Sequence, residues 1–215
     1  MGDFLAFLER RWEHLLELTL AHAVLVAGSV LIATVIGMAL GVLTYRTERP
    51  RDLVLAVTGT FLTIPSLALF GLFLVLLGLG VLPVVIALVM YGLLPIVRNT
   101  IVGLREVDAA VVESAQGMGM GRTRRLLRIE LPLAWPVILT GMRVSTLLVL
   151  GIAAIGAYIN GPGLGNDIFS GIARVGTPVG VHLVLGGMLG IVLLAILFDL
   201  LFVLIARLTT SRGLR

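Results

Sequence analysis

The residue types that most often carry out chemistry are scarce in this sequence. There is no cysteine, and the three histidines, His14, His22 and His182, lack the spacing of metal ligands. All sixteen basic residues are arginine, so a phosphate-binding G-x-x-x-x-G-K-[ST] loop is absent from this sequence. The sequence therefore predicts no catalytic residue, no metal site and no cofactor in this chain. If ATP and Mg²⁺ drive its function, a partner subunit binds them.

The charged residues are concentrated in one segment. Residues 98–130 hold ten of the 28 charged side chains (16 basic and 12 acidic), although apolar stretches flank them on both sides. Connections of this length between regular elements are uncommon in compact proteins and are usually functional. A segment with so much charge must face water or a partner, so we expect it to carry a binding surface.

This charged segment is predicted to form two short helices. Asp108 is placed to cap a helix that runs to Met118, because its carboxylate can accept hydrogen bonds from the free N–H groups of the first turn. Three alternating glycines then break that helix: Gly117, Gly119 and Gly121. A second, arginine-rich helix is expected over residues 123–130, and Pro132 lies just beyond its end.

Apolar spans must hold this segment in place. Hydrophobic residues make up 59% of the chain and charged residues only 13%, against about 25% charged residues in a soluble domain. A bilayer crossing needs about 20 apolar residues, and five segments meet this length: residues 18–45, 53–77, 82–103, 135–158 and 179–205. Glycine and proline in residues 78–83 predict the turn between the second and third spans. We therefore expect one all-α polytopic membrane domain over residues 1–215, with five transmembrane helices and a charged loop over residues 104–132.

The arginines predict how the spans are oriented. Twelve lie on the side of the charged loop and three, Arg10, Arg11 and Arg174, lie on the other side. The positive-inside rule then places the loop and the C-terminus in the cytoplasm and the N-terminus outside. This rule also explains the net charge of +4 without a nucleic-acid partner. Residues 1–16 are expected to be an external amphipathic lead-in at the membrane surface, or a simple polar lead-in.

A family resemblance lies in the charged loop. Glu113-Ser114-Ala115, three residues, Gly119, nine residues and then Ile129-Glu130-Leu131-Pro132 resemble the EAA motif of bacterial ABC-importer permeases, with Ser114 where alanine is usual. The resemblance implies a type I importer permease fold like that of the methionine importer, with a coupling helix that docks on a cytoplasmic ATPase. It implies the following ATPase-coupling residues: Glu113, Ser114, Ala115, Gly119, Ile129, Leu131 and Pro132. A basic amphipathic helix resting on anionic lipid is the alternative.

Other stretches are similar to one subfamily, the osmoprotectant importers for glycine betaine, carnitine and choline. They are Ile64-Pro65-Ser66-Leu67-Ala68-Leu69, residues 94–100, residues 117–120 and the glycine-rich residues 155–168, hereafter the gate loop. The resemblance implies that the gate loop is an external gate containing Gly161, Gly163 and Gly165. The sequence departs from the family at Pro162, where glycine or alanine is usual, and at Ala109, where proline is frequent.

The resemblance also implies an assembly in the bacterial cytoplasmic (inner) membrane. Its members are cytoplasmic ATP-binding subunits, a second permease subunit, identical or paralogous, and an external substrate-binding protein. The binding protein is expected to be separate, because the sequence ends about ten residues after its last span. Two other functions stay open: an amino-acid importer of the methionine type, and an ATP-independent secondary transporter or channel. Inverted repeats would favour the latter, and we recognise none in the sequence.

Polar and proline residues within the spans are candidates for the translocation path. They are Thr63, Pro65, Ser66, Tyr91, Pro95 and Asn99. Neither proline can donate to the carbonyl four residues earlier, and irregular backbone in a membrane needs water or protein partners. A packing kink is the alternative for each proline.

Two charges lie inside the predicted spans. Arg143 in the fourth span and Asp199 in the fifth are expected about 10–12 Å from the cytoplasmic face, at 1.5 Å per residue. Charged residues at such depth usually face the bundle interior and pair, so the sequence predicts an ion pair. The alternative is that Arg143 extends to the interface and Asp199 lines a wet crevice.

Overall fold

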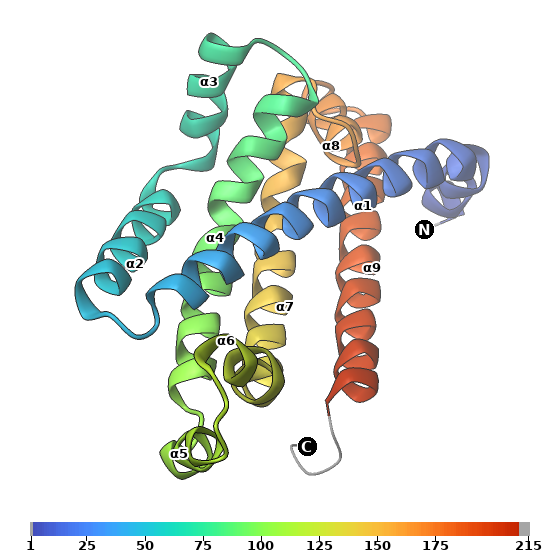
Figure 1. Cartoon of the computed structure of the whole chain (residues 1–215). Coiled ribbons are helices and arrows are strands. Elements are labelled where there is room, and N and C mark those ends of the chain that lie inside the picture. Colours follow the sequence, from blue (N-terminus) through green and yellow to red (C-terminus); the bar gives the residue numbers. More distant parts are fainter. Residues whose placement is uncertain (1, 211–215) are drawn as a thin grey trace.

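The computed structural model describes residues 2–210, and all regular structure in this range is helical (Figure 1). The elements in chain order are α1 (Gly2–Thr44), α2 (Glu48–Thr63), α3 (Ser66–Leu77), α4 (Val81–Arg105), α5 (Ala109–Gly117), α6 (Arg122–Arg125), the π-helical η1 (Leu126–Glu130), α7 (Leu131–Ile155), the 3₁₀ turn η2 (Gly156–Ile159), α8 (Gly165–Ile172) and α9 (Pro178–Thr209). The short helices α5 and α6 lie at one end of the bundle, hereafter the loop end, and α8 lies at the opposite end, hereafter the gate end. The predicted all-α fold is confirmed.

The helix α4 forms the centre of the bundle. Its side chains Val84, Ala87, Leu88 and Ile96 are fully buried, and α1 and α7 pack against it (Figure 1). Small residues allow these close contacts. A Cβ added at Gly103 would lie 2.9 Å from the Ala134 carbonyl oxygen of α7, so the two backbones touch.

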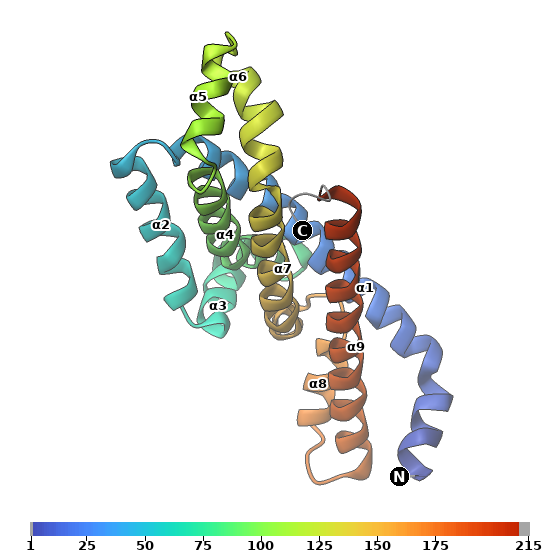
Figure 2. The same ribbon diagram turned by 90° about the horizontal axis from the view of Figure 1, so that it is seen from below.

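The helix α1 runs obliquely across α4 and α7, and its first turns lie beside α9 (Figures 1 and 2). The side chains of Arg11 and His14 reach Asp167 of α8. The predicted lead-in, residues 1–16, is described from residue 2, and this part is the beginning of one continuous 43-residue helix. Gly37 and Gly41 of α1 face Ile96 and Thr100 of α4. This glycine pair thus permits close packing within the chain.

Within residues 2–210, four helices are long and apolar enough to cross a membrane, and the pair α2 and α3 makes a fifth candidate if it is counted as one span. The prediction of a single helix over residues 53–77 is wrong in detail, because α2 and α3 meet at 95°. Pro65 at the break cannot donate a backbone hydrogen bond. The Ile64 N–H instead bonds to the Phe61 carbonyl at 3.4 Å, and the Tyr91 hydroxyl donates to the Ile64 carbonyl at 2.7 Å. The break is therefore held by α4.

The predicted stop before the fourth span is also wrong. The helix from α6 continues through η1 into α7 without a break. In η1 the Leu131 N–H donates to the Leu126 carbonyl, five residues back. This wider π-helical turn carries the chain past Pro132, which lies in the first turn of α7. Pro136 also lies within α7.

The helical run Arg122–Ile159 contains 38 residues and is therefore about 57 Å long at 1.5 Å per residue. A bilayer core is about 30 Å thick, so this run is longer than one crossing needs. We infer that its part at the loop end, α6 and η1 (Figure 1), extends beyond the membrane. The outer faces of the spans are apolar. The long helix α9 alone exposes Leu185, Val192, Leu197 and Leu204 by more than 40%, as expected for side chains that contact lipid or a second subunit.

Candidate functional site

The helix α5 is built by local signals in the charged loop over residues 104–132, hereafter called the coupling loop after its predicted role. Asp108 caps it, with its side chain accepting from the Ala110 N–H at 2.8 Å, as the sequence predicts. The helix ends at Gly117 with Met118 as its C-cap, and the next residue, Gly119, has a φ of +78°. The Met120 N–H bonds to the Ala115 carbonyl and the Gly119 N–H bonds to that of Gln116. This paired arrangement is a Schellman motif, which favours glycine at the position that Gly119 occupies.

The predicted coupling residues lie on both sides of this motif. Ala115 is the buried residue of α5. Glu113, Ser114 and Gly119 are exposed. Ile129 and Leu131 are half-buried where η1 meets α7, and Pro132 is exposed next to them. The surface of α5 also presents Met118, which is 70% exposed. A rigid short helix with charged, small and apolar residues facing outward is suited to docking against a protein.

Glu130 lies within the EAA-like motif, but the sequence alone predicts no role for it. Glu130 is 2% exposed, and its carboxylate accepts hydrogen bonds from Tyr45 at 2.6 Å, from Arg46 at 2.8 Å and from Arg125 at 2.8 Å. These four residues are hereafter the Glu130 cluster. A lone acid after several arginines, followed by an apolar run, was the available signal in the sequence.

The electrostatics of the Glu130 cluster favour the carboxylate. Burial alone would raise the pKa of Glu130, but the hydrogen bonds from Tyr45, Arg125 and Arg46 outweigh burial, so this pKa lies below its ordinary value. Burial, together with the Glu130 carboxylate, raises the pKa of Tyr45 to about 12. The hydroxyl therefore keeps its proton and donates it, and the cluster ties the turn after α1 to the end of η1.

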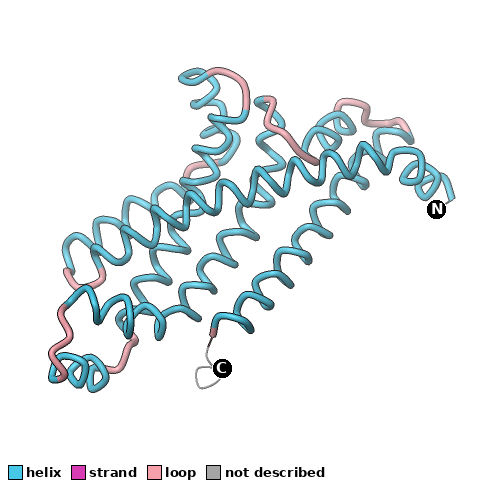
Figure 3. The backbone as a smooth tube through the Cα atoms, turned by 45° about the vertical axis from the view of Figure 1, so that its right-hand side comes forward, coloured by secondary structure: helices cyan, strands magenta, loops and turns pink. Residues whose placement is uncertain are grey.

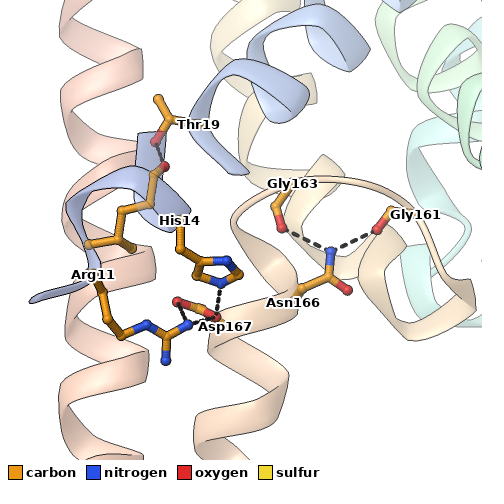
Figure 4. A network of polar contacts seen from close by, with 8 residues as sticks. Arg11, His14, Thr19, Gly161, Gly163, Asn166 and Asp167 are labelled. Atoms are coloured by element: carbon orange, nitrogen blue, oxygen red, sulfur yellow. Dashed lines mark hydrogen bonds and ion pairs between the residues drawn. The ribbon is translucent and has the colours of Figure 1, made fainter. Parts of the chain in front are cut away.

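The gate loop is shaped by glycine at the gate end. A Cβ at Gly165 would lie 2.0 Å from the Ala154 carbonyl oxygen, and one at Gly161 would lie 2.7 Å from that of Gly156. Gly163 has a φ of +122°. The Asn166 side chain donates to the carbonyls of Gly161 and Gly163 at 3.0 and 2.9 Å (Figure 4). The three predicted glycines are therefore brought together in one tight turn, which leads into α8.

The candidate path residues separate into two groups. Tyr91 is buried in its contact with the Ile64 carbonyl, and Asn99 donates to the Pro95 carbonyl at 2.8 Å. Pro95 and Asn99 also face Gly141 of α7 across a close helix contact. These three residues therefore make packing contacts in the chain, and their place in the translocation path stays a prediction.

The second group lies at the break between α2 and α3. Thr63 and Pro65 are exposed there, and Ser66 is half-buried. The Thr63 hydroxyl is satisfied by the Thr60 carbonyl at 2.8 Å. These residues stay candidates for the translocation path, because they present polar backbone at an irregular point of a span.

The two charges inside the spans lie together. The Arg143 Nε donates to the Asp199 Oδ1 at 2.5 Å, with side-chain exposures of 43% and 33%. A cavity of about 310 Å³ between α7 and α9 borders Arg143. Among residues 2–210, no three histidine, aspartate or glutamate side chains are grouped so that they could hold a metal ion.

Comparison of the sequence with known proteins identifies the family of this chain. Residues 33–212 match the family described as "Binding-protein-dependent transport system inner membrane component". The chain is 34% identical to the choline transport system permease protein OpuBB of Bacillus subtilis (strain 168), over 100% of this chain and 97% of the relative. It is 33% identical, with the same coverage, to the glycine betaine/carnitine/choline transport system permease protein OpuCB of that organism.

Comparison of structures gives the same fold. A chain of the MetNI methionine ABC transporter, in an inward-facing conformation, superimposes with a TM-score of 0.80. The match covers 92% of this chain and 96% of the other, at 21% identity. At this identity the likeness establishes the fold alone.

Proposed function

Because the chain belongs to the family of inner membrane components of binding-protein-dependent transport systems, we propose that it is the permease subunit of an ATP-driven importer for a compatible solute. The solute class is glycine betaine, choline or carnitine. The names of the relatives that match nearly the whole chain support this class. The aromatic content of 6% leaves few ring faces for a quaternary ammonium group, so tight recognition belongs to the binding protein.

The single observation that best supports the coupling role is the structure and position of α5. It is a short exposed helix, capped at Asp108 and closed by the Schellman motif at Gly119, on a loop that joins the central helices α4 and α7. A displacement of α5 by a partner is therefore passed directly to the two helices that form the centre of the bundle. Glu113 and Gly119 are exposed for that contact.

The assembly we propose has separate subunits for ATP and for solute capture. ATP and Mg²⁺ bind to cytoplasmic ATPase subunits, a second permease subunit completes the path, and a separate external protein delivers the solute. The arginine distribution supports a cytoplasmic loop end and an external gate end. In this orientation α5 faces the ATPase, and the gate loop faces the binding protein.

Uptake by reconstituted vesicles tests this function. The full chain is reconstituted with the ATPase and binding protein of the same importer, and labelled glycine betaine, choline and methionine compete for uptake with and without ATP. We expect ATP-dependent uptake in which methionine does not compete. Uptake of labelled methionine, without uptake of glycine betaine or choline, would indicate an amino-acid importer. Solute uptake at the same rate with and without ATP would indicate a secondary transporter or channel.

A further inference from the structure

The helix α1 contacts both functional ends of the chain. At the loop end, Tyr45 lies directly after α1, and its hydroxyl and the neighbouring Arg46 hold Glu130. Glu130 ends η1 and immediately precedes α7. The residue separations are 85 and 84, so these bonds join parts of the chain that no local signal brings together.

At the gate end, α1 holds the first turn of α8. Asp167 is 5% exposed, and its carboxylate accepts from Arg11 and from His14, each at 3.2 Å (Figure 4). We refer to these three residues as the Asp167 cluster. The next residue toward the N-terminus, Asn166, fixes the gate loop through two backbone carbonyls. The cluster therefore fastens α1 to the element that shapes the gate.

A third contact lies between these clusters. His22 of α1 is fully buried, and its Nε2 lies 3.1 Å from the Leu150 carbonyl oxygen of α7. The carbonyl only accepts, so Nε2 is the nitrogen that carries the proton. A Cβ at Gly163 would lie 2.6 Å from the Nδ1 of the same ring. The gate loop therefore rests directly on a side chain of α1.

We propose that α1 clamps the segment from η1 through α7 to α8 at both ends, with Glu130 at the end of η1 and Asp167 in α8 as the positioning residues of the clamp. This inference rests on the proposed function. If the clamp holds, α1 and α7 move together as one rigid unit. A displacement of the coupling loop is then transmitted to the gate loop by the movement of this unit. With either carboxylate neutralised, α7 remains connected to the gate loop through the chain, but α1 no longer prevents the two helices from shearing.

Two links in one frame are expected to depend on each other. While one cluster is intact, it keeps the partners of the other at high effective concentration. Mutations far apart usually have additive effects, so a departure from additivity between Glu130 and Asp167 indicates the clamp. We expect Glu130→Gln and Asp167→Asn each to lower the Tm of the purified chain, and the double variant to lower it clearly less than the sum.

This first measurement needs no ATPase or solute, so it is independent of the proposed function. Glu13→Gln and Glu106→Gln are matched controls, since they neutralise exposed carboxylates on α1 and at the end of α4. Additive Tm shifts would overturn the clamp. If a carboxylate variant fails to accumulate, the pair Tyr45→Phe and Arg11→Gln removes one donor from each cluster and serves in the same cycle.

A second measurement tests transmission, using labelled glycine betaine as the probe. In vesicles that contain the ATPase and the binding protein, each single variant should take up at least about five-fold less solute per ATP hydrolysed, the lower range of typical coupling effects. ATP hydrolysis itself should stay close to that of the parent, which a general folding defect would not allow. Unchanged solute per ATP in either single variant would overturn the proposal. No ATP-driven uptake by the parent would instead refute the proposed function.

Discussion

Substitutions at Gly119 separate the folding of the coupling loop from its docking. Gly119 has a φ of +78°, and a Cβ added there meets no atom within 4 Å. Any L side chain therefore costs backbone strain of about 1–2 kcal/mol, and the cost does not grow with side-chain size in the isolated chain. Asparagine tolerates this conformation better than most residues. We expect Gly119→Ala and Gly119→Leu to lose equal stability and Gly119→Asn to lose less.

Transport should order the same variants differently. If a partner surface lies against Gly119, the leucine side chain must displace it, whereas the alanine methyl group adds little bulk. We therefore expect uptake of labelled glycine betaine to fall far more in Gly119→Leu than in Gly119→Ala, at equal amounts of protein in the membrane. Thermal unfolding of the purified chain should show shifts of about 2–4 °C per kcal/mol, the scale for soluble domains of this size.

A matched control is available two residues further on. Gly121 is also exposed and open to a Cβ, but its φ is −65°, so Gly121→Leu adds bulk without strain. Unimpaired uptake by Gly119→Leu at normal expression would refute the docking role. Equal transport losses in the alanine and leucine variants would show that strain, and not a partner, explains the sensitivity of this position.

Three further predictions concern topology, the Glu130 cluster and the charges within the spans. A Ser170→Cys variant should react with an impermeant thiol reagent from outside and Thr123→Cys only from the cytoplasm, since the parent has no cysteine; reversed labelling would overturn the orientation. The pKa of Glu130 is lowered, so its stabilising contribution is present above the ordinary glutamate pKa and is lost as pH falls through the lower folded value. The Tm difference between the parent and Glu130→Gln should therefore be constant from pH 8 to 6 and shrink below about pH 4; a difference already lost at about pH 6 would contradict this. Arg143→Leu and Asp199→Leu should each cost about 1–3 kcal/mol, between the values for exposed and buried pairs, and the double variant should recover much of it; simple addition of the two losses would show that the pair adds no stability.

The features that the sequence predicts well depend on neighbours along the chain. Long uncharged runs predict the spans, because the bilayer core demands apolar side chains over a fixed length. Among residues 2–210, four of the five predicted runs overlap helices that are long and apolar enough to cross a membrane. The capping of α5 by Asp108 and the Schellman motif at Gly119 follow from hydrogen bonds that reach only two to five residues. The turn at Gly78 and Gly80 likewise has positive φ at both glycines. In each case the deciding contacts lie within one turn of the residue that signals them.

The features that the sequence misses depend on contacts across the fold. Pro65 alone predicts a weakened helix, but at the 95° break the Ile64 carbonyl is satisfied by the Tyr91 hydroxyl, which lies 27 residues further along the chain than Ile64. Pro132 signals a stop, yet η1 shifts the hydrogen-bond register and the helix continues. Local propensity fails at both prolines because the backbone has a second way to satisfy its polar groups.

The burial of Glu130 and Asp167 likewise depends on contacts that the sequence does not reveal. Acidic residues are almost never fully buried unless they are paired, so a pattern in the sequence assigns both to the surface. Their partners in α1 and in the turn after it are 84 to 156 residues away, and only the oblique course of α1 brings them near (Figure 3). A carboxylate buried on arginine at each end of one helix is costly unless both partners stay in place. That requirement, together with the close packing of α1 on α4, favours one position of α1 across α4 and α7, and it is the physical basis for the part in coupling that we propose for α1.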